Sequence, residues 1–136
     1  MNELIKKIKE AEMIYICGNG GSAATADHFA TDLIKLRYPA VSLCSNTSVL
    51  TMIGNDFGFE DLFSFQLVGL PTSGALLITI SCSGTSPNII KALFFAKWLR
   101  MDTYSFETFE TFKKGKDYGK LEDEHLKFIH KLIKKL

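Results

Sequence analysis

Two periodicities of apolar residues alternate along this chain, and together they predict strands separated by helices. Three short apolar runs, each bounded by turn residues, predict buried strands over residues 13–17, 40–44 and 75–81. Apolar residues spaced three and four apart predict helices over residues 4–11, 23–36, 49–53, 62–68 and 87–99. Because strands that alternate with helices need crossover connections, we expect an α/β fold, doubly wound, with helices on both faces of a mostly parallel sheet.

The segment from residue 100 to residue 120 interrupts this alternation. Its aromatic residues Tyr104, Phe106, Phe109 and Phe112 are spaced more like a helix than a strand, so no further strand is expected there. Exposed aromatic side chains in this segment would suit a subunit interface. Residues 122–130 beyond it fall in a Lys-rich amphipathic helix that closes the chain.

Composition and charge narrow the class of protein. A chain of 136 residues, 46% hydrophobic and 23% charged, is typical of one globular domain, which we place at 1–136. A net charge of +1 argues against a general nucleic-acid or membrane-surface binder, whose affinity comes mainly from excess Lys and Arg. Neither an apolar stretch of roughly 20 residues nor a secretory leader is present, so we expect a cytoplasmic protein.

The three cysteines fit a reducing compartment. Cys17, Cys44 and Cys82 each lie in or at the end of an apolar run, and their number is odd. A disulfide framework favours an even number, and a zinc knuckle needs close C-x-x-C pairs. We therefore expect buried, reduced thiols.

The loop that follows the first predicted strand is rich in glycine. Its sequence, GNGGS at residues 18–22, lets the backbone approach a ligand, and the helix that follows presents unpaired N–H groups to an anion. With Ala23 the loop also fits the spacing of a dinucleotide-binding turn, which needs an acidic residue after the second strand. The chain has Cys44, Ser45 and Asn46 there, which weakens that alternative. A tight turn without a ligand is the third interpretation.

The loop that follows the third predicted strand is rich in hydroxyl groups. Residues 81–86 read SCSGTS, and Pro87 then favours the first position of a helix with Ser86 as its N-cap. One capping serine would satisfy the helix, so three serines and a threonine point to a bound phosphate monoester. The absence of Gly-Lys-Ser/Thr excludes a nucleoside-triphosphate loop. Since ligands bind at the carboxyl ends of parallel strands, both loops together favour a small phosphorylated metabolite.

Four motifs follow one another along the chain and carry a resemblance to a known family. They are GNGGSAA at 18–24, HFA at 28–30, GNDFG at 54–58 and ISCSGTSPN at 80–88. In this order they resemble the phosphoheptose isomerase branch of the sugar isomerase (SIS) family, over residues 13–99 and again over 122–130. The resemblance implies an SIS-type three-layer fold and a ketose–aldose isomerase that converts sedoheptulose 7-phosphate to D-glycero-D-manno-heptose 7-phosphate, for bacterial surface polysaccharide.

The resemblance also implies a site, a metal and an assembly. Members of this branch are homotetramers with one zinc ion per site, and their sites are shared between subunits. Carried over by position, the metal and acid–base residues are His28, Asp32, Glu122 and His130. The substrate-binding residues are Asn19, Gly20, Gly21, Ser22, Asn55, Asp56, Ser81, Cys82, Ser83, Ser86 and Glu122.

The chemistry of these residues agrees with an enediol isomerisation. His28 and Asp32 are four residues apart on a predicted helix, so both side chains lie on one face, and imidazole with carboxylate suits zinc. Our hypothesis makes Asp32 the base and His130 the partner acid, with zinc polarising the carbonyl. Glu122 and His130 are eight residues apart, roughly 12 Å along a helix, so one straight helix cannot bring both to one ion. Either Glu122 precedes the helix or neighbouring subunits contribute one residue each.

Several departures from the family keep a second function open. Asp32 stands where the family usually has Glu, Glu122 where it has Gln, and Cys82 where it has Thr. Relative to the family, the chain begins just before the first strand and lacks the next strand and turn between residues 100 and 120, which would allow a dimer instead of a tetramer. The alternative is a sugar-phosphate-binding SIS module without catalysis, with a regulatory or assembly role.

Overall fold

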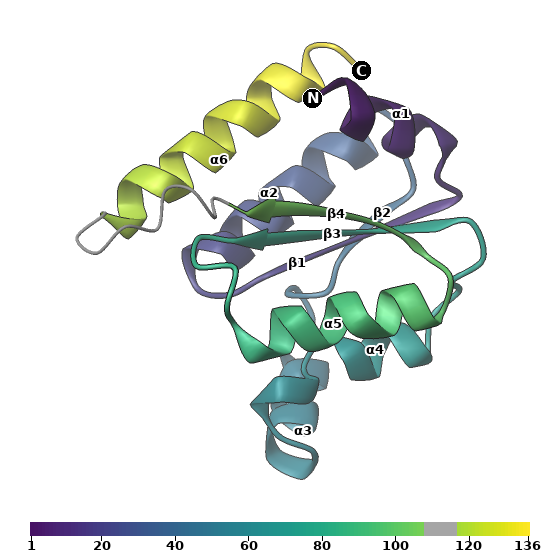
Figure 1. Cartoon of the computed structure of the whole chain (residues 1–136), viewed down its shortest axis with the longest axis vertical. Helices are drawn as coiled ribbons and strands as arrows, with labels where there is room; N and C mark the ends of the chain where they lie inside the picture. Colours follow the sequence, from purple (N-terminus) through teal and green to yellow (C-terminus); the bar gives the residue numbers. More distant parts are fainter. Residues whose placement is uncertain (108–116) are drawn as a thin grey trace.

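Four parallel strands form one sheet at the centre of the molecule (Figure 1), as seen in a computed structural model that describes residues 1–107 and 117–136. The strand order is β2-β1-β3-β4, and every neighbouring pair is parallel. The strands are β1 (Met13–Gly18), β2 (Ala40–Ser42), β3 (Ala75–Ser81) and β4 (Asp102–Glu107). The predicted α/β class and parallel sheet are confirmed.

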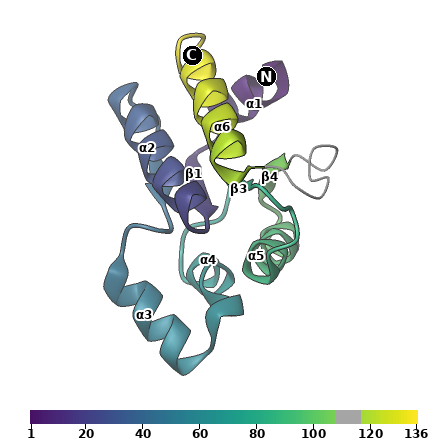
Figure 2. The same ribbon diagram turned by 90° about the vertical axis from the view of Figure 1, so that its left-hand side faces the viewer.

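Helices cover both faces of the sheet and make three layers (Figures 1 and 2). On one face lie α1 (Asn2–Glu10), α2 (Gly21–Lys35) and α6 (Tyr118–Ile133). On the other lie α3 (Thr47–Asp56), the short 3₁₀ helix η1 (Phe59–Asp61), α4 (Ser64–Val68) and α5 (Pro87–Trp98). Since α6 contains Glu122, the idea that this residue precedes the last helix is wrong.

The two faces of the sheet carry separate cores because successive side chains of a strand point to opposite sides. In β3, Leu76 and Ile78 pack with α1, α2 and α6, whereas Leu77 packs with α4 and α5. Every residue of β3 is buried, as expected for a strand covered on both faces. β3 begins and ends where the sequence predicts.

The absence of a strand between residues 100 and 120 is a prediction that the structure contradicts. β4 pairs with β3 from Asp102 to Glu107, so Tyr104 and Phe106 are alternate residues of a strand. Phe106 is buried beneath α6, with its ring against Phe29 and Phe128. The helix-like spacing depended on counting Phe109 and Phe112 with them, and both fall outside the described residues.

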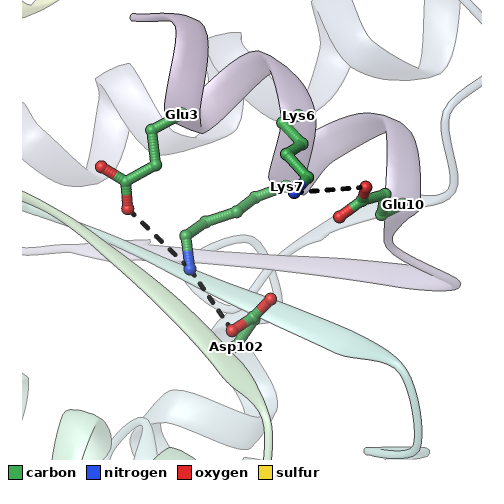
Figure 3. A network of polar contacts seen from close by, with 5 residues as sticks. All are labelled: Glu3, Lys6, Lys7, Glu10 and Asp102. Atoms are coloured by element: carbon green, nitrogen blue, oxygen red, sulfur yellow. Dashed lines mark hydrogen bonds and ion pairs between the residues drawn. The ribbon is translucent and has the colours of Figure 1, made fainter.

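A network of ion pairs ties α1 to the first residue of β4 (Figure 3). Lys7 Nζ lies 3.3 Å from Asp102 Oδ1 and 4.0 Å from Glu3 Oε1. Lys6 and Glu10 form a further pair at 4.0 Å on the same helix. Because most of these side chains are exposed, each pair contributes at most about 1 kcal/mol, and the buried face of α1 does more to hold it.

In the part of the chain that is described, no helix combines the length and apolar character needed to cross a bilayer.

Candidate functional site

The two loops singled out in the sequence lie side by side at the carboxyl edge of the sheet. β1 and β3 are neighbours, with Gly18 opposite Ile80 in the register, so the segments that follow them meet. They line a cavity of about 140 Å³ together with the start of α6. Its lining residues are Asn19, Ser22, Ile80, Ser81, Cys82, Ser83, Ser86, Tyr118 and Glu122.

Two glycines give the first loop its shape. At Gly18 an added Cβ would lie 2.6 Å from the carbonyl oxygen of Ser22 and 2.9 Å from that of Ile80, so only glycine fits between these backbones. Gly20 is the N-cap of α2 with φ +57°, a conformation that side chains other than glycine rarely adopt. The loop can therefore turn sharply and present the start of α2 to the cavity.

A pair of asparagines holds the two loops together. Asn19 Nδ2 donates to Asn88 Oδ1 at 2.8 Å, and Asn88 Nδ2 donates to Asn19 Oδ1 at 2.8 Å. Asn88 is fully buried in the first turn of α5. Asn88 belongs to the motif at residues 80–88 and was assigned no role from the sequence, although an asparagine on a helix otherwise rich in apolar residues was the available signal.

The hydroxyl groups of the second loop order the loop itself. Ser81 Oγ accepts from the Gly84 N–H at 3.0 Å, and Ser83 Oγ accepts from the Thr85 N–H at 3.2 Å. Ser86 is the N-cap of α5, as predicted, but its side chain makes no capping hydrogen bond and lies 3.5 Å from Ser83 Oγ. Ser86 thus keeps hydrogen-bonding capacity for a ligand at the N-terminus of α5.

Cys82 contributes a thiol to the cavity wall. Its sulfur lies 3.9 Å from Ser22 Oγ, which joins the wall to the first turn of α2. Burial raises the pKa of the Cys82 thiol above its ordinary value, the Ser22 hydrogen bond lowers it, and the charge of Glu122 raises it further. All three cysteines are free thiols, and Cys17 and Cys82 are buried as expected, whereas Cys44 is only half-buried.

A second group of functional side chains lies farther along α2 and α6. His28 Nε2 is 3.0 Å from His130 Nε2 and 3.3 Å from Asp32 Oδ2. One ligand atom from each of the three residues falls within 4.8 Å of the others. Two imidazole nitrogens and a carboxylate oxygen are a donor set that zinc prefers, so the residues fit that ion.

The start of α6 and its middle serve different clusters. Figure 2 shows α2 and α6 side by side. Glu122 contacts Gly21 at the start of α2, whereas His130 contacts His28 seven residues later. Glu122 lines the cavity. Because the eight residues from Glu122 to His130 rise about 12 Å along the helix, Glu122 lies outside the histidine cluster of its own chain.

The structure does not bring Asn55 and Asp56 to the cavity. Both belong to the last turn of α3, where Asn55 Nδ2 donates to Asp56 Oδ1 at 2.7 Å. Both side chains are exposed and neither lines the cavity. Their predicted contact with the sugar would therefore need a neighbouring subunit.

His125 is a buried polar residue that the sequence analysis did not single out. It is 5% exposed, and neither of its ring nitrogens has a hydrogen-bond partner among the described residues. Its ring packs edge-on against Phe106 of β4, with centroids 5.8 Å apart. Burial lowers the pKa of His125, and the nearby Glu124 raises it by a smaller amount.

Comparison with known proteins supports the family that the four sequence motifs indicate. The SIS domain model matches residues 2–107, which include β4. A phosphoheptose isomerase from Nitratiruptor sp. is 41% identical over 125 residues, which cover 88% of this chain and 63% of that relative. One from Campylobacter concisus is 36% identical over 141 residues, which cover 90% of this chain and 74% of the relative. This chain thus spans less than two thirds of the first relative's length.

A solved structure shows the same architecture. The phosphoheptose isomerase of Neisseria gonorrhoeae superposes with a TM-score of 0.86 at 31% identity, covering 98% of this chain and 80% of that one. The fold, the four motifs and the extent of these matches lead to one assignment. The chain belongs to the SIS domain family, in its phosphoheptose isomerase branch.

Proposed function

We propose that this protein is a ketose–aldose isomerase that converts sedoheptulose 7-phosphate to D-glycero-D-manno-heptose 7-phosphate, in the cytoplasm, for bacterial surface polysaccharide. One observation carries the proposal: α2 and α6 place a hydroxyl-lined cavity and an imidazole–carboxylate cluster along the same pair of helices. From Gly21 to His28, α2 rises about 10 Å. That arrangement suits a sugar chain with its phosphate at one end and its reacting carbons at the other.

The phosphate end of the substrate would bind in the cavity. Serine hydroxyls and the N-termini of two long helices, α2 and α5, supply hydrogen-bond donors and positive partial charge there. Ser86, whose side chain does not cap α5, is positioned to donate to a phosphate oxygen. Asn19 acts mainly by holding its loop against Asn88.

The reacting end would lie at the histidine cluster. Asp32, as the base, removes a proton from C1 of the ketose and returns it to C2, while His130 exchanges the hydroxyl protons between O1 and O2. The net change is the transfer of two hydrogens within one molecule, so no oxidant or second substrate is needed. His28 contacts both residues and orients them.

His28, Asp32 and His130 would also hold one zinc ion per subunit. Zinc, when bound, supplies a Lewis acid that polarises the carbonyl of the substrate. Asp32 Oδ2 faces His28, which leaves Asp32 Oδ1 outside that contact. Asp32 is 24% exposed at its side chain and His28 47%, so the cluster is open to a ligand.

A homo-oligomer, a tetramer or a dimer, is part of the same proposal. Ile90, Phe94 and Trp98 recur every four residues along α5 and are 52%, 66% and 69% exposed. Such a stripe suits contact with a second copy of the chain. A neighbouring subunit would also supply Asn55 and Asp56, which do not line the cavity of their own chain. We propose neither a nucleic-acid nor a membrane partner.

Two residues support a second function, that of a sugar-phosphate-binding SIS module without catalysis. Asp32 is one methylene shorter than the usual glutamate, which reduces the reach of the proposed base. Glu122 places a carboxylate in the cavity, where the family has a neutral glutamine.

Turnover of sedoheptulose 7-phosphate distinguishes the two functions. We expect aldose formation that is lost after chelation and restored by zinc. Asp32→Ala and His130→Ala should each lower kcat by at least about a hundredfold, the contribution of a positioned acid or base. Circular dichroism should show both variants folded, since neither side chain is fully buried. Near-normal turnover of His130→Ala would contradict the assignment of the acid, and binding without turnover in the wild type would favour the second function.

A further inference from the structure

Glu122 occupies the point where the cavity meets the start of α2. Its carboxylate oxygens lie where a side chain on Gly21, the first residue of α2, would begin. The same side chain lines the cavity with Ser22, Ser81 and Ser83. A phosphate bound in the cavity would therefore need the same space as the Glu122 side chain and the same helix terminus.

A carboxylate in this position changes the electrostatics of the cavity. The first turn of a helix carries a positive partial charge, which a nearby anion stabilises. At the start of α2 the N–H groups of Ser22 and Ala23 already donate to the carbonyl oxygens of Asn19 and Gly20, and the Glu122 carboxylate beside Gly21 brings a negative charge to this terminus. In the described part of the chain, no Lys or Arg lines the cavity to offset the charge. The charge of Glu122 also raises the pKa of the Cys82 thiol, which is a second sign that this charge acts inside the cavity.

We propose that Glu122 is a specificity-determining residue that competes with the ligand's phosphate group for the start of α2. This inference rests on the proposed function, because it takes the cavity as the phosphate site. The Glu122 carboxylate must move aside, or tolerate a second negative charge beside it, before a phosphate binds. The chain consequently binds phosphate esters more weakly than the same cavity would with a neutral side chain at this position.

Calorimetric titration with inorganic phosphate and with sedoheptulose 7-phosphate tests the inference. Glu122→Gln keeps the shape of the side chain and removes its charge. The matched control is Asp123→Asn, which makes the same charge change at the next residue of α6, whose side chain is exposed. From the repulsion of two charges about 4 Å apart in water, we expect Glu122→Gln to bind both ligands about fivefold more tightly or better. Asp123→Asn should stay within about twofold of the wild type.

Equal or weaker binding by Glu122→Gln overturns the inference, because the carboxylate would then be accepting hydrogen bonds from the ligand. Tightening of the same size in Asp123→Asn also overturns it, since net charge alone would explain the change. If neither wild type nor Glu122→Gln binds phosphate or the sugar phosphate, the inference and the phosphate site of the proposed function both fail. Tightening without turnover leaves the inference standing and removes only the isomerase.

Discussion

At the scale of single residues, the site depends on where backbones and side chains come closest. Gly18 lies between two carbonyl oxygens, and Gly21 lies beneath the Glu122 carboxylate. These two contacts differ in kind. The Glu122 carboxylate is at the end of a flexible side chain and can shift, whereas the backbones of α2 and β3 beside Gly18 cannot. The sharpest steric test of the first loop is therefore at Gly18.

Gly18→Ala should destabilise the fold by about 1–3 kcal/mol, the usual cost of forcing a methyl group into a packed region. The added carbon would meet the backbones of α2 and β3, so both loops should shift and turnover should fall. Urea unfolding measures the free energy of unfolding. Gly54→Ala is the control: its nearest neighbour is Leu62 at 3.8 Å, and alanine within α3 should stabilise the protein by about 0.5–1 kcal/mol. Equal stability of the two variants would contradict the tight fit at Gly18.

At the scale of elements, α6 links the sheet to both functional clusters. One face of this helix packs Leu121, His125, Ile129 and Leu132 into the molecule. On other sides of this helix, Glu122 lines the cavity and His130 belongs to the histidine cluster. Any change that loosens α6 from β4 should therefore disturb both ends of the proposed site.

The buried His125 should make the packing of α6 sensitive to acid. Burial lowers its pKa in the folded protein, so the unfolded chain, with a pKa near 6.5, binds the proton more readily. Stability is then fully present above about pH 6.5 and is lost as the pH falls from there through the folded pKa. Glu124 works against this effect without reversing it. His125→Phe should flatten the decrease in unfolding free energy between pH 7.5 and pH 5.5, measured by urea titration at each pH. An unchanged slope would show that other groups cause the acid sensitivity.

At the scale of the whole molecule, the proposed assembly depends on the apolar stripe of α5. Ile90, Phe94 and Trp98 lie on the side of the sheet opposite α2 and α6. A subunit docked there would leave the histidine cluster of the same chain open. A change on this stripe should therefore separate the subunits without disturbing the histidine cluster, although it would also remove the Asn55 and Asp56 that a neighbouring subunit supplies in the proposed site.

Phe94→Glu should dissociate the oligomer, because it places a charge in the middle of the stripe. Sedimentation velocity at micromolar concentration should give the mass of a monomer, 15.2 kDa. Ile34→Glu is the matched control, since Ile34 is also an exposed apolar residue (57%, against 66% for Phe94) and lies on α2, in the other layer. An oligomer that survives Phe94→Glu, or dissociates equally with Ile34→Glu, would exclude α5 as the interface.

Features that depend on local chemistry could be predicted from the order of the amino acids alone. The apolar run 75–81 matches β3 at both ends, because a strand buried on both faces must be continuously apolar and is bounded by turn residues. The loops at residues 18–22 and 81–86 were identified from local composition, because glycine and hydroxyl residues that follow a buried strand and precede a helix are typical of an anion-binding loop. The four motifs then identified the family.

The remaining features could be seen only in the folded molecule, because they depend on contacts between residues that are distant along the chain. β4 is recognised as a strand from its pairing with β3 and from the burial of Phe106 against α2 and α6, because the aromatic spacing of the longer segment, counted through Phe109 and Phe112, favoured a helix. The pairing of Asn19 with Asn88 and the meeting of His28 with His130 join residues 69 and 102 positions apart. The same holds for Glu122, whose place against Gly21 is set by how α6 packs along α2 and not by any local pattern.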